Sequence, residues 1–523
     1  MSEKKLSFPP FTNEPFTDFS KEENRREMLA ALAHVKRELN RTYPLHIGGK
    51  EVYTGDWIIS INPAHTGETI GKVSKAGLEQ AEQAMQSALQ VFESWKKTSV
   101  AERAALLVNA ANLMRQRKHE FSARLVFESG KNWGEADADT AEAIDFLEYY
   151  AREMIRLDET NEHRPLVPVA GETNRLSYIP LGVGIVIPPW NFPLAICAGM
   201  SAAAVVAGNT IILKPASTTP VIAYKFYEVM VEAGIPADVI QYLPGSGSEI
   251  GDYLVGHPQT RFISFTGSKE VGLHINQLAA GQAPGQIWIK RLIAEMGGKD
   301  GIVVDETADL DAAADAIVAS AFGFQGQKCS AGSRAIIVQD VYDELVDKIT
   351  ERTARLIVGL PEDNVPVGPV IDNSSYKRIL DYIEKGKAEG KLLAGGGKAP
   401  GSGYFIEPTV FSDVAEDAVL MQEEIFGPVL AISKAKDWQD AIRIYNHTEF
   451  GLTGSYFSAD EQRIGVALEH MHCGNLYINR KCTGALVGAH PFGGFNLSGT
   501  DSKAGGHDYL LLFTQAKLTS RKN

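Results

Sequence analysis

The sequence has few cysteines and no block of positive charge, and both absences narrow what the protein can be. Its 523 residues include only Cys197, Cys329, Cys473 and Cys482, at irregular spacing. So few scattered thiols argue against a disulfide framework and favour reduced cysteines. The formal net charge is −14, without a basic run that could follow a phosphate backbone. We therefore expect no nucleic-acid partner.

Long apolar segments are also scarce. Residues 1–19 lack the apolar stretch and cleavage site of a secretion signal, which favours a cytoplasmic location. Residues 193–213 carry no charge over a length that could span a membrane. That run is rich in alanine and glycine, and at Gly208-Asn209 helix-like spacing gives way to β-branched residues. It predicts a buried helix followed by a buried strand, and no membrane association.

The chain does contain the alternating pattern of α/β proteins. Its length exceeds the roughly 250–300 residues at which single cores stop growing, so two or more domains are expected. Short apolar runs alternate with helical segments between residues 209 and 295, and a second series follows residue 300 and includes a helix at 310–322. This alternation predicts parallel βα units in two α/β domains.

Other segments have a different pattern. Charged amphipathic stretches predict surface helices at 78–95, 101–129 and 135–152. Residues 166–182 and 509–521 have the pattern of strands. Strands need an edge to pair with, and a partner subunit is one way to cover it.

One cysteine stands apart in the stretch FQGQKCSAGSR, residues 324–334. A loop of free backbone N–H groups could favour the thiolate of Cys329, but a buried cysteine acting as a small hydrophobe is an equal alternative on this stretch alone. Cys197 and Cys473 lie in apolar surroundings and are expected in the core, whereas Cys482 in a glycine-rich loop stays open. The local HMHC sequence at 470–473 lacks a third well-spaced ligand, so we expect no metal.

Three further residues could act with this cysteine. Glu295 ends an apolar run before a Gly-Gly turn, where a carboxylate held by apolar neighbours can act as a general base. Asn191, between aromatic residues in a proline-bounded loop, offers a rigid amide donor for an oxyanion. Gly267-Ser268 joins a strand to a helix, where N–H groups can meet a phosphate. Each signal alone is weak.

The motifs together identify a family resemblance. PWNFP, KPAS, FTGSKEVG, EMGGK, GQKCSAGSR, EEIFGPV and PFGGF follow one another along most of the chain. In order and approximate spacing they resemble the NAD(P)-dependent aldehyde dehydrogenase superfamily. The resemblance implies an α/β aldehyde dehydrogenase fold, with a Rossmann-like cofactor domain, an α/β catalytic domain and a β oligomerisation flap.

The resemblance also implies domain limits and assembly. The NAD(P)-binding domain would comprise residues 1–156 and 178–297, and the catalytic domain residues 298–490. Residues 157–177 and 505–523 would be oligomerisation segments. We therefore expect a homodimer, or a hexamer built from dimers.

The matching positions imply a role for each site residue. Cys329 would be the nucleophile, Glu295 the base that activates the hydrolytic water, and Asn191, with the Cys329 backbone N–H, the oxyanion hole. The cofactor would be NAD, and NADP is expected to be tolerated. The positions that match cofactor contacts are Pro189, Trp190, Lys214, Ser217, Gly267, Ser268, Gly272, Glu424 and Phe426.

Within the superfamily, EMGGKD, FGFQGQKCSAGSRAI, CTGALVGAHPFGGF and SGTDSKAGGHDYLLLFTQAK resemble the 1-pyrroline-5-carboxylate dehydrogenases. This implies oxidation of L-glutamate γ-semialdehyde, the open form of 1-pyrroline-5-carboxylate, to L-glutamate in proline and arginine degradation. A hydroxyl and free backbone amides can bind the α-carboxylate without a full positive charge. The implied substrate contacts are Phe192, Ser330, Gly484, Ala485 and Phe492.

Alternatives remain. Another semialdehyde dehydrogenase, for example one acting on succinate semialdehyde, would share the catalytic residues, but its acid-binding site should carry an arginine, which residues 483–488 lack. A catalytically silent protein on this scaffold would not need the three catalytic residues together, and a cysteine hydrolase would leave the cofactor motifs unexplained. Ser217 stands where many NAD-specific relatives have a glutamate that repels a 2′-phosphate, so NADP use stays open.

Overall fold

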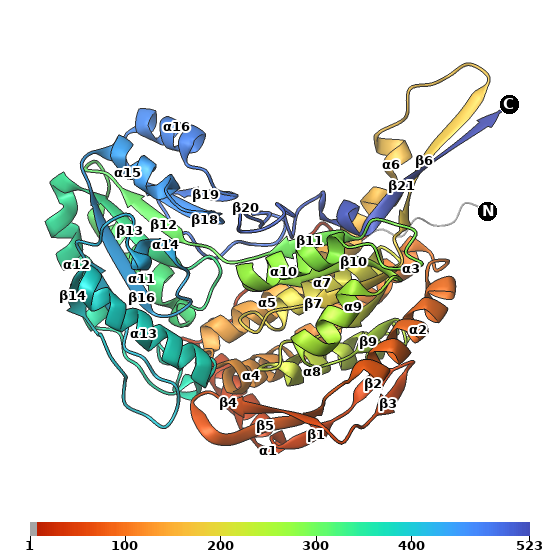
Figure 1. The fold of residues 1–523 in the computed structure, drawn as a ribbon, viewed down its shortest axis with the longest axis horizontal. Helices are drawn as coiled ribbons and strands as arrows, with labels where there is room; N and C mark the ends of the chain where they lie inside the picture. Colours follow the sequence, from red (N-terminus) through yellow and green to blue (C-terminus); the bar gives the residue numbers. More distant parts are fainter. Residues whose placement is uncertain (1–7) are drawn as a thin grey trace.

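The fold is built around two seven-stranded sheets, each flanked by helices (Figure 1). The computed structural model describes residues 8–523, so the first seven residues of the segment considered as a secretion signal lie outside it. Neighbouring strands in both sheets are mainly parallel, as the alternation of strands and helices predicts. In the described part of the chain, no helix is long and apolar enough to cross a membrane.

The first sheet has the order β11-β10-β7-β8-β9-β2-β3. Its strands are β2 (Leu45–Ile47), β3 (Lys50–Val52), β7 (Val183–Ile187), β8 (Thr210–Leu213), β9 (Ile240–Tyr242), β10 (Thr260–Thr266) and β11 (Arg291–Glu295). The uncharged run at 193–213 forms the buried helix α7 (Ala195–Val206) and the buried strand β8, as expected. By contrast, only the second half of the apolar run before Glu295 is strand, since Ile287 and Ile289 are exposed.

The second sheet has the order β14-β15-β16-β13-β12-β18-β19, with β14 antiparallel to its neighbour. Its strands are β12 (Asp300–Val304), β13 (Gly332–Val338), β14 (Lys391–Ala394), β15 (Thr409–Ser412), β16 (Val429–Ala435), β18 (Thr453–Phe457) and β19 (Asn475–Ile478). Helix α11 (Leu310–Phe322) has the predicted bounds. The other helices of this half are α12 (Tyr342–Ala354), α13 (Asn373–Glu389), α14 (Val419–Gln422), α15 (Trp438–Asn446) and α16 (Glu461–His470).

The helices between β3 and β7 differ from their prediction in three ways. Helix α2 (Leu78–Trp95) has the predicted bounds, but the range 101–129 forms two helices, α3 (Val100–Gln116) and α4 (Lys118–Ser129), because Arg117 has non-helical dihedral angles. The third helix, α5 (Trp133–Asp158), is longer than predicted. The expectation of surface helices is wrong for α4 and α5, which are largely buried.

Buried partners explain how these charged helices can lie inside the protein. Glu128 of α4 accepts hydrogen bonds from the backbone N–H groups of Val221 and Ile222, at 2.9 and 2.8 Å. Lys131, just before α5, pairs with Asp139 of α5 at 2.8 Å, with both side chains fully buried. Amphipathic spacing alone does not reveal such pairing, because it depends on which residues the fold brings together.

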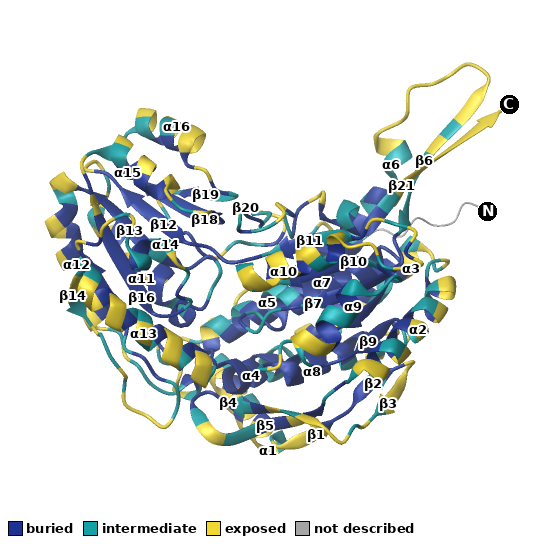
Figure 2. Ribbon diagram, in the orientation of Figure 1, coloured by how far each residue is buried: buried dark blue, intermediate teal, exposed yellow. Residues whose placement is uncertain are grey.

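An antiparallel ribbon of two strands, from distant parts of the chain, projects from the body of the molecule (Figure 1). It consists of β6 (Glu172–Pro180) and β21 (Thr514–Lys522), and most of it is exposed (Figure 2). The predicted strands were longer than these. Residues 166–171 are not strand, and residues 509–513 form the 3-10 helix η5 (Tyr509–Phe513), because Tyr509, Leu510 and Phe513 pack into the core next to the first sheet.

The remaining elements complete the two halves, and the predicted domain limits stay predictions. They are α1 (Glu22–Glu38), β1 (Arg41–Tyr43), β4 (Trp57–Asn62), β5 (His65–Ser74), α6 (Thr160–His163), α8 (Pro220–Glu232), η1 (Gly247–Gly251), α9 (Asp252–Gly256), α10 (Lys269–Ala280), η2 (Gly323–Gly326), η3 (Gln339–Val341), η4 (Pro361–Asp363), β17 (Phe450–Gly451) and β20 (Phe495–Asn496).

Candidate active site

A cleft of about 810 Å³ lies between the two halves of the protein. Residues 187–191, after β7, and residues 265–271, at the end of β10 and the start of α10, form one side. Residues 423–426, before β16, contribute from the other half, and Cys329 is part of the lining. Ligand sites of open α/β sheets lie beyond the carboxyl ends of the strands, and this cleft has the volume of a cofactor site.

The loop that carries Cys329 has an unusual backbone. Phe324 and Gln325 have positive φ angles of 47° and 56°, a region that residues other than glycine rarely adopt. Gln325 Nε2 holds the loop by donating to the backbone oxygens of Gly130 and Pro369, at 3.1 and 2.8 Å. Gln327 Oε1 accepts from the Ile371 backbone N–H at 2.9 Å. Such strain persists only where the surroundings enforce it, which is common at active sites.

Asn191 is brought to this loop, as predicted. Its Nδ2 donates to the backbone oxygen of Gln327 at 3.1 Å, and the side chain is 4% exposed. A primary amide has two N–H donors, so one remains for a ligand. Both Asn191 and Cys329 line the cleft, where the second donor can meet an oxyanion formed at the cysteine.

The thiol of Cys329 is not easily ionised in this state. Its pKa is raised above its usual range by burial first, and then by the negative charges of Asp300, Glu424 and Glu295. The Ser330 backbone N–H acts in the opposite direction. Thiolate formation therefore depends on the protonation of the neighbouring carboxyl groups.

Glu295 lies at the end of β11, as predicted, but it is not among the residues that line the cleft, and its carboxylate oxygens lie next to residues 493–502. It accepts a hydrogen bond from Ser502 Oγ through Oε1, and its buried Oε2 has no hydrogen-bond partner in the described part of the chain. Burial raises the pKa of Glu295 to about 7, while Ser502 lowers it. A carboxylate with this pKa can accept a proton from water near neutral pH.

Six of the predicted cofactor residues line the cleft: Pro189, Trp190, Gly267, Ser268, Glu424 and Phe426. The rings of Trp190 and Phe426 meet edge to face at 5.3 Å. Glu424 Oε1 accepts from the Gly298 backbone N–H at 3.0 Å, and burial raises the pKa of Glu424 to about 7. A Cβ on Gly297 would lie 2.2 Å from Glu424 Oε2, so only glycine leaves room for this carboxylate.

Ser268 begins α10, and its Oγ accepts from the Val271 backbone N–H at 3.3 Å. The remaining N–H groups of this first turn are available to a phosphate, and the adjacent Gly267 presents no side chain. The cleft therefore fits a dinucleotide cofactor.

The other three predicted cofactor residues do not line the cleft. Lys214, at the end of β8, is 6% exposed, and burial lowers its pKa to about 8. Ser217 is exposed next to Ala216, which does line the cleft. A Cβ on Gly272 would lie 2.3 Å from Met296 Sδ, so this glycine permits close packing of α10 on the end of β11.

Three of the predicted substrate residues, Ser330, Gly484 and Ala485, lie on two loops that are in contact. Cys482 Sγ donates to the backbone oxygen of Ser330 at 3.4 Å, which joins the loop before Gly484 to the nucleophile loop. Gly484 has a positive φ of 79°, and Arg480 donates to its backbone oxygen at 3.2 Å. Ala485 is half-buried.

Two aromatic residues complete the predicted substrate contacts. Phe192 follows Asn191, and its ring lies 6.3 Å from that of Phe324. Phe492 is half-buried and is held by backbone hydrogen bonds to Ala504 in both directions.

The sequence reasoning did not identify several residues of the active-site region. Lys131 Nζ lies 3.9 Å from the ring centre of Phe192, and Lys328 pairs with Glu135 at 2.7 Å. Ser502, the partner of Glu295, was also missed. Lys328 is adjacent to Cys329 in the sequence, but its partner Glu135 is 193 residues away. Phe192 is likewise far in sequence from Lys131, and Ser502 from Glu295, so no local pattern could have identified these pairs.

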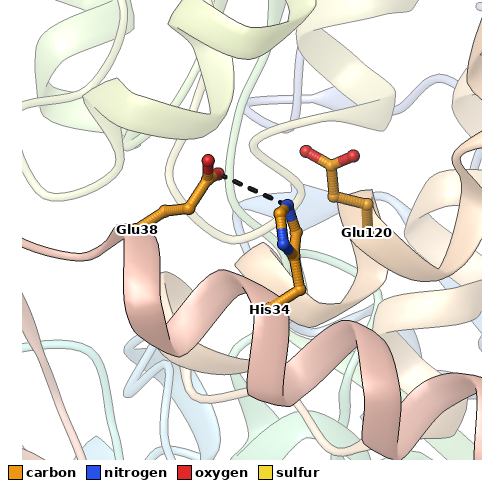
Figure 3. A group of neighbouring side chains, drawn as sticks. All are labelled: His34, Glu38 and Glu120. Atoms are coloured by element: carbon orange, nitrogen blue, oxygen red, sulfur yellow. Dashed lines mark ion pairs between the residues drawn. The ribbon is translucent and has the colours of Figure 1, made fainter.

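One group of side chains in residues 8–523 has the spacing of metal ligands, and it lies outside the active site. It consists of His34, Glu38 and Glu120 (Figure 3). The same nitrogen of Arg124 donates to both carboxylates, and Arg41 pairs with Glu38, so two arginines face the two carboxylates. This group is better described as an ion-pair network than as a metal site.

Comparison with known proteins agrees with the motifs. A profile of the aldehyde dehydrogenase family matches residues 53–519. The 1-pyrroline-5-carboxylate dehydrogenase of Geobacillus sp. (strain WCH70) is 60% identical over 514 residues, 98% of this chain and 99% of that protein. A protein of the same name from Anoxybacillus flavithermus (strain DSM 21510 / WK1) is 59% identical with the same coverage.

Solved structures give the same result. A 1-pyrroline-5-carboxylate dehydrogenase from Thermus with bound NAD matches with a TM-score of 0.97 and 50% identity, covering 99% of this chain and 100% of that chain. Proline utilization A from Bdellovibrio bacteriovorus matches at 0.96 and 45%, covering 99% of this chain and 54% of that chain. The expected aldehyde dehydrogenase fold is confirmed, and the chain belongs to the aldehyde dehydrogenase family.

Proposed function

We propose that the protein oxidises L-glutamate γ-semialdehyde to L-glutamate with NAD, through a thioester on Cys329, in the degradation of proline and arginine. The observation that carries this proposal is the placement of Cys329 on the wall of the cofactor cleft, with Asn191 bonded to the same loop. Relatives about 60% identical over nearly the whole chain share the name 1-pyrroline-5-carboxylate dehydrogenase, which supports the choice of substrate.

The first half of the reaction forms the thioester. The Cys329 thiolate adds to the aldehyde carbon, a C–S bond forms, and the carbonyl oxygen becomes an oxyanion. The free N–H of Asn191 and the Cys329 backbone N–H stabilise this oxyanion. NAD, when bound, supplies the acceptor for the hydride that leaves the same carbon.

The second half hydrolyses the thioester. Glu295 takes a proton from a water molecule, and the resulting hydroxide attacks the thioester carbon. The C–S bond breaks and Cys329 leaves as the thiolate. The carboxylic acid product loses its proton to solvent to become the carboxylate, and Glu295 releases to solvent the proton that it took from water. Asn191 stabilises the second oxyanion in the same way as the first.

The cofactor is held by residues of both halves. Trp190, Ser268 and Phe426 line the cleft, and Glu424 offers a carboxylate to a ribose. Ser217, exposed next to the cleft, brings no negative charge that would repel a 2′-phosphate, so NADP is accepted as well.

The amino-acid end of the substrate is bound by Ser330 and by the backbone amides of Gly484 and Ala485. Ser330 is 9% exposed and directly follows Cys329. A hydroxyl next to the nucleophile can donate a hydrogen bond to a carboxylate oxygen of the substrate. A semialdehyde without the amino-acid group would leave these donors unpaired, which disfavours the succinate semialdehyde alternative.

Assembly through the projecting two-stranded ribbon is the second part of this proposal. Residues directly paired across antiparallel strands share a face, and Leu176 pairs with Leu518 and Tyr178 with Ala516. The other face carries Ser177 opposite Lys517 and Arg175 opposite Thr519. The first face thus has an apolar middle part, where Leu518 is 60% exposed, and polar pairs between residues 172–174 and 520–522 beyond it. A second copy of the chain covers this face in a homodimer, which can build a hexamer.

A steady-state assay tests the proposed reaction. The purified protein is mixed with 1-pyrroline-5-carboxylate and NAD, and the absorbance of the reduced cofactor is followed. We expect turnover with a kcat/KM far above that for butanal or succinate semialdehyde. Comparable efficiency with either of these aldehydes would contradict the substrate assignment while leaving the chemistry intact.

A further inference from the structure

Asp300 is a buried acid that the proposed mechanism does not use. It is the first residue of β12, is 2% exposed, and pairs with Gly332 at the start of β13, three residues after Cys329. The Thr453 backbone N–H donates to its Oδ1 at 2.6 Å. Its Oδ2 has no hydrogen-bond partner, and no ion pair involves Asp300 in the part of the chain that the structure describes.

The free oxygen of Asp300 faces the backbone of the nucleophile. A Cβ built on Gly298 would lie 2.5 Å from Asp300 Oδ2 and 2.6 Å from the backbone oxygen of Cys329. Both oxygens therefore border the same small space, which a side chain at position 298 would fill. A proton on Asp300 would make this carboxyl group a donor beside the Cys329 backbone oxygen, which can only accept.

The charged groups around Asp300 do not neutralise it directly. The titratable groups that face it are Arg334, Lys299, Glu424, Tyr445, Cys473 and Cys482. Arg334 directs its N–H groups to the backbone oxygens of Lys299, Ile444 and Tyr445. Lys299 Nζ is buried without a hydrogen-bond partner.

These surroundings favour a neutral acid. Burial raises the pKa of Asp300 to about 8 and outweighs the hydrogen bonding of Thr453 and the positive charge of Arg334, which lower it, while the negative charge of Glu424 acts in the same direction as burial. Asp300 is also the first of the charges that raise the pKa of the Cys329 thiol. An ionised Asp300 would therefore oppose the formation of the thiolate.

We propose that Asp300 is a positioning residue that works as a neutral carboxylic acid, whose bound proton keeps negative charge away from Cys329 and so allows the thiol to ionise. Asp300 touches neither substrate nor cofactor in this role. It acts through Cys329 alone. A higher pH favours the Cys329 thiolate, but it also removes the proton of Asp300, and the resulting negative charge opposes the thiolate.

Alkylation of the full-length protein by iodoacetamide at different pH values tests this proposal, with peptide mass spectrometry to confirm that Cys329 is the site. In Asp300→Asn the negative charge can never form at this position, so the curve of alkylation rate against pH should move to lower pH. Near pH 9 the variant should react roughly threefold to tenfold faster than the wild type, since one pKa unit is a tenfold change in thiolate. Near pH 6, where Asp300 is already neutral, the two proteins should react alike.

A matched control is Asp305→Asn, which removes the carboxylate that follows β12, paired with Arg463. Its alkylation curve should equal that of the wild type. In addition, kcat of Asp300→Asn at pH 7 should stay within a few-fold of wild type. If Asp300→Asn folds poorly, Asp300→Ser, also neutral, should shift the curve in the same direction. Identical curves for the wild type and the neutral variants, or a shift to higher pH, would overturn the proposal.

Discussion

Three carboxyl groups, of Glu295, Asp300 and Glu424, influence the thiol of Cys329, and their hydrogen-bond partners distinguish them. Glu295 accepts from Ser502 Oγ, Glu424 from the Gly298 backbone N–H, and Asp300 from the Thr453 backbone N–H. Burial raises the pKa of all three, to about 7, 7 and 8. Carboxyl groups poised near neutral pH can exchange protons during a reaction, and this property fits Glu295 for the role of base.

The pH dependence of thioester hydrolysis should follow Glu295. Only the unprotonated carboxylate accepts a proton, so the rate should fall as the pH drops through about 7. Because the Ser502 hydrogen bond lowers the pKa of Glu295, Ser502→Ala should move the pH at which the hydrolysis rate falls to a higher value. Stopped-flow measurement of deacylation provides the test, with the exposed Ser520→Ala as control. If the hydrolysis rate of Ser502→Ala falls at the same pH as that of the wild type, Glu295 is not the base that determines this pH dependence.

Ser330 should decide between substrates. If its hydroxyl binds the α-carboxylate, Ser330→Ala removes a charge-assisted hydrogen bond of roughly 1.5–3 kcal/mol, about a tenfold to hundredfold loss in kcat/KM for the semialdehyde. Butanal, which has no carboxylate, should be affected far less. Parallel kinetics with both aldehydes measure the difference, and an equal loss for both would remove Ser330 from the substrate site.

Ser217 should control the choice of cofactor. A carboxylate at this position would repel the 2′-phosphate of NADP, so Ser217→Glu should lower kcat/KM for NADP more than for NAD. Ser217→Thr keeps the hydroxyl and serves as the control. Equal effects of the glutamate on both cofactors would mean that this side chain does not face the ribose.

At the scale of elements, the ribbon of β6 and β21 has an apolar middle part on one face and polar residues on the other. Leu518→Glu would put a charge on the apolar face, and we expect it to weaken the dimer because a buried charge without a partner is strongly unfavourable. Lys517→Glu changes the charge of the adjacent residue on the polar face and should leave assembly unchanged. Analytical ultracentrifugation at micromolar concentration compares the variants. A monomeric wild-type protein, or no effect of Leu518→Glu, would contradict this assignment.

The elements also show what the sequence could predict. The bounds of α2 and α11 follow from the amphipathic pattern, because both helices have one face toward the core and one toward solvent. The same reasoning fails for α5, whose acidic residues pair with cations outside the helix, Asp139 with Lys131 and Glu135 with Lys328. It fails again at residues 509–513, where tertiary packing favours a 3-10 helix over a strand. Long-range pairing, which has no local signature, explains each of these errors.

At the scale of the whole molecule, the active site joins segments that are far apart in the chain. The cleft contains residues from both sheets, and Glu295 is held by Ser502, which is 207 residues away. The motifs identified Cys329 and Asn191, which the fold brings to one loop. They could not show that Lys214, Ser217 and Gly272 lie off the wall of the cleft, because that depends on how the two halves meet.

Mass spectrometry of Glu295→Gln tests the central claim most directly. The variant lacks the base for hydrolysis, so after mixing with 1-pyrroline-5-carboxylate and NAD it should release about one equivalent of reduced cofactor per active site and then stop. The quenched protein should carry the acyl group of glutamate γ-semialdehyde on the peptide that contains Cys329. Cys329→Ala should bind NAD yet show neither the adduct nor reduced cofactor. Full turnover by Glu295→Gln, or an adduct on another residue, would contradict the account.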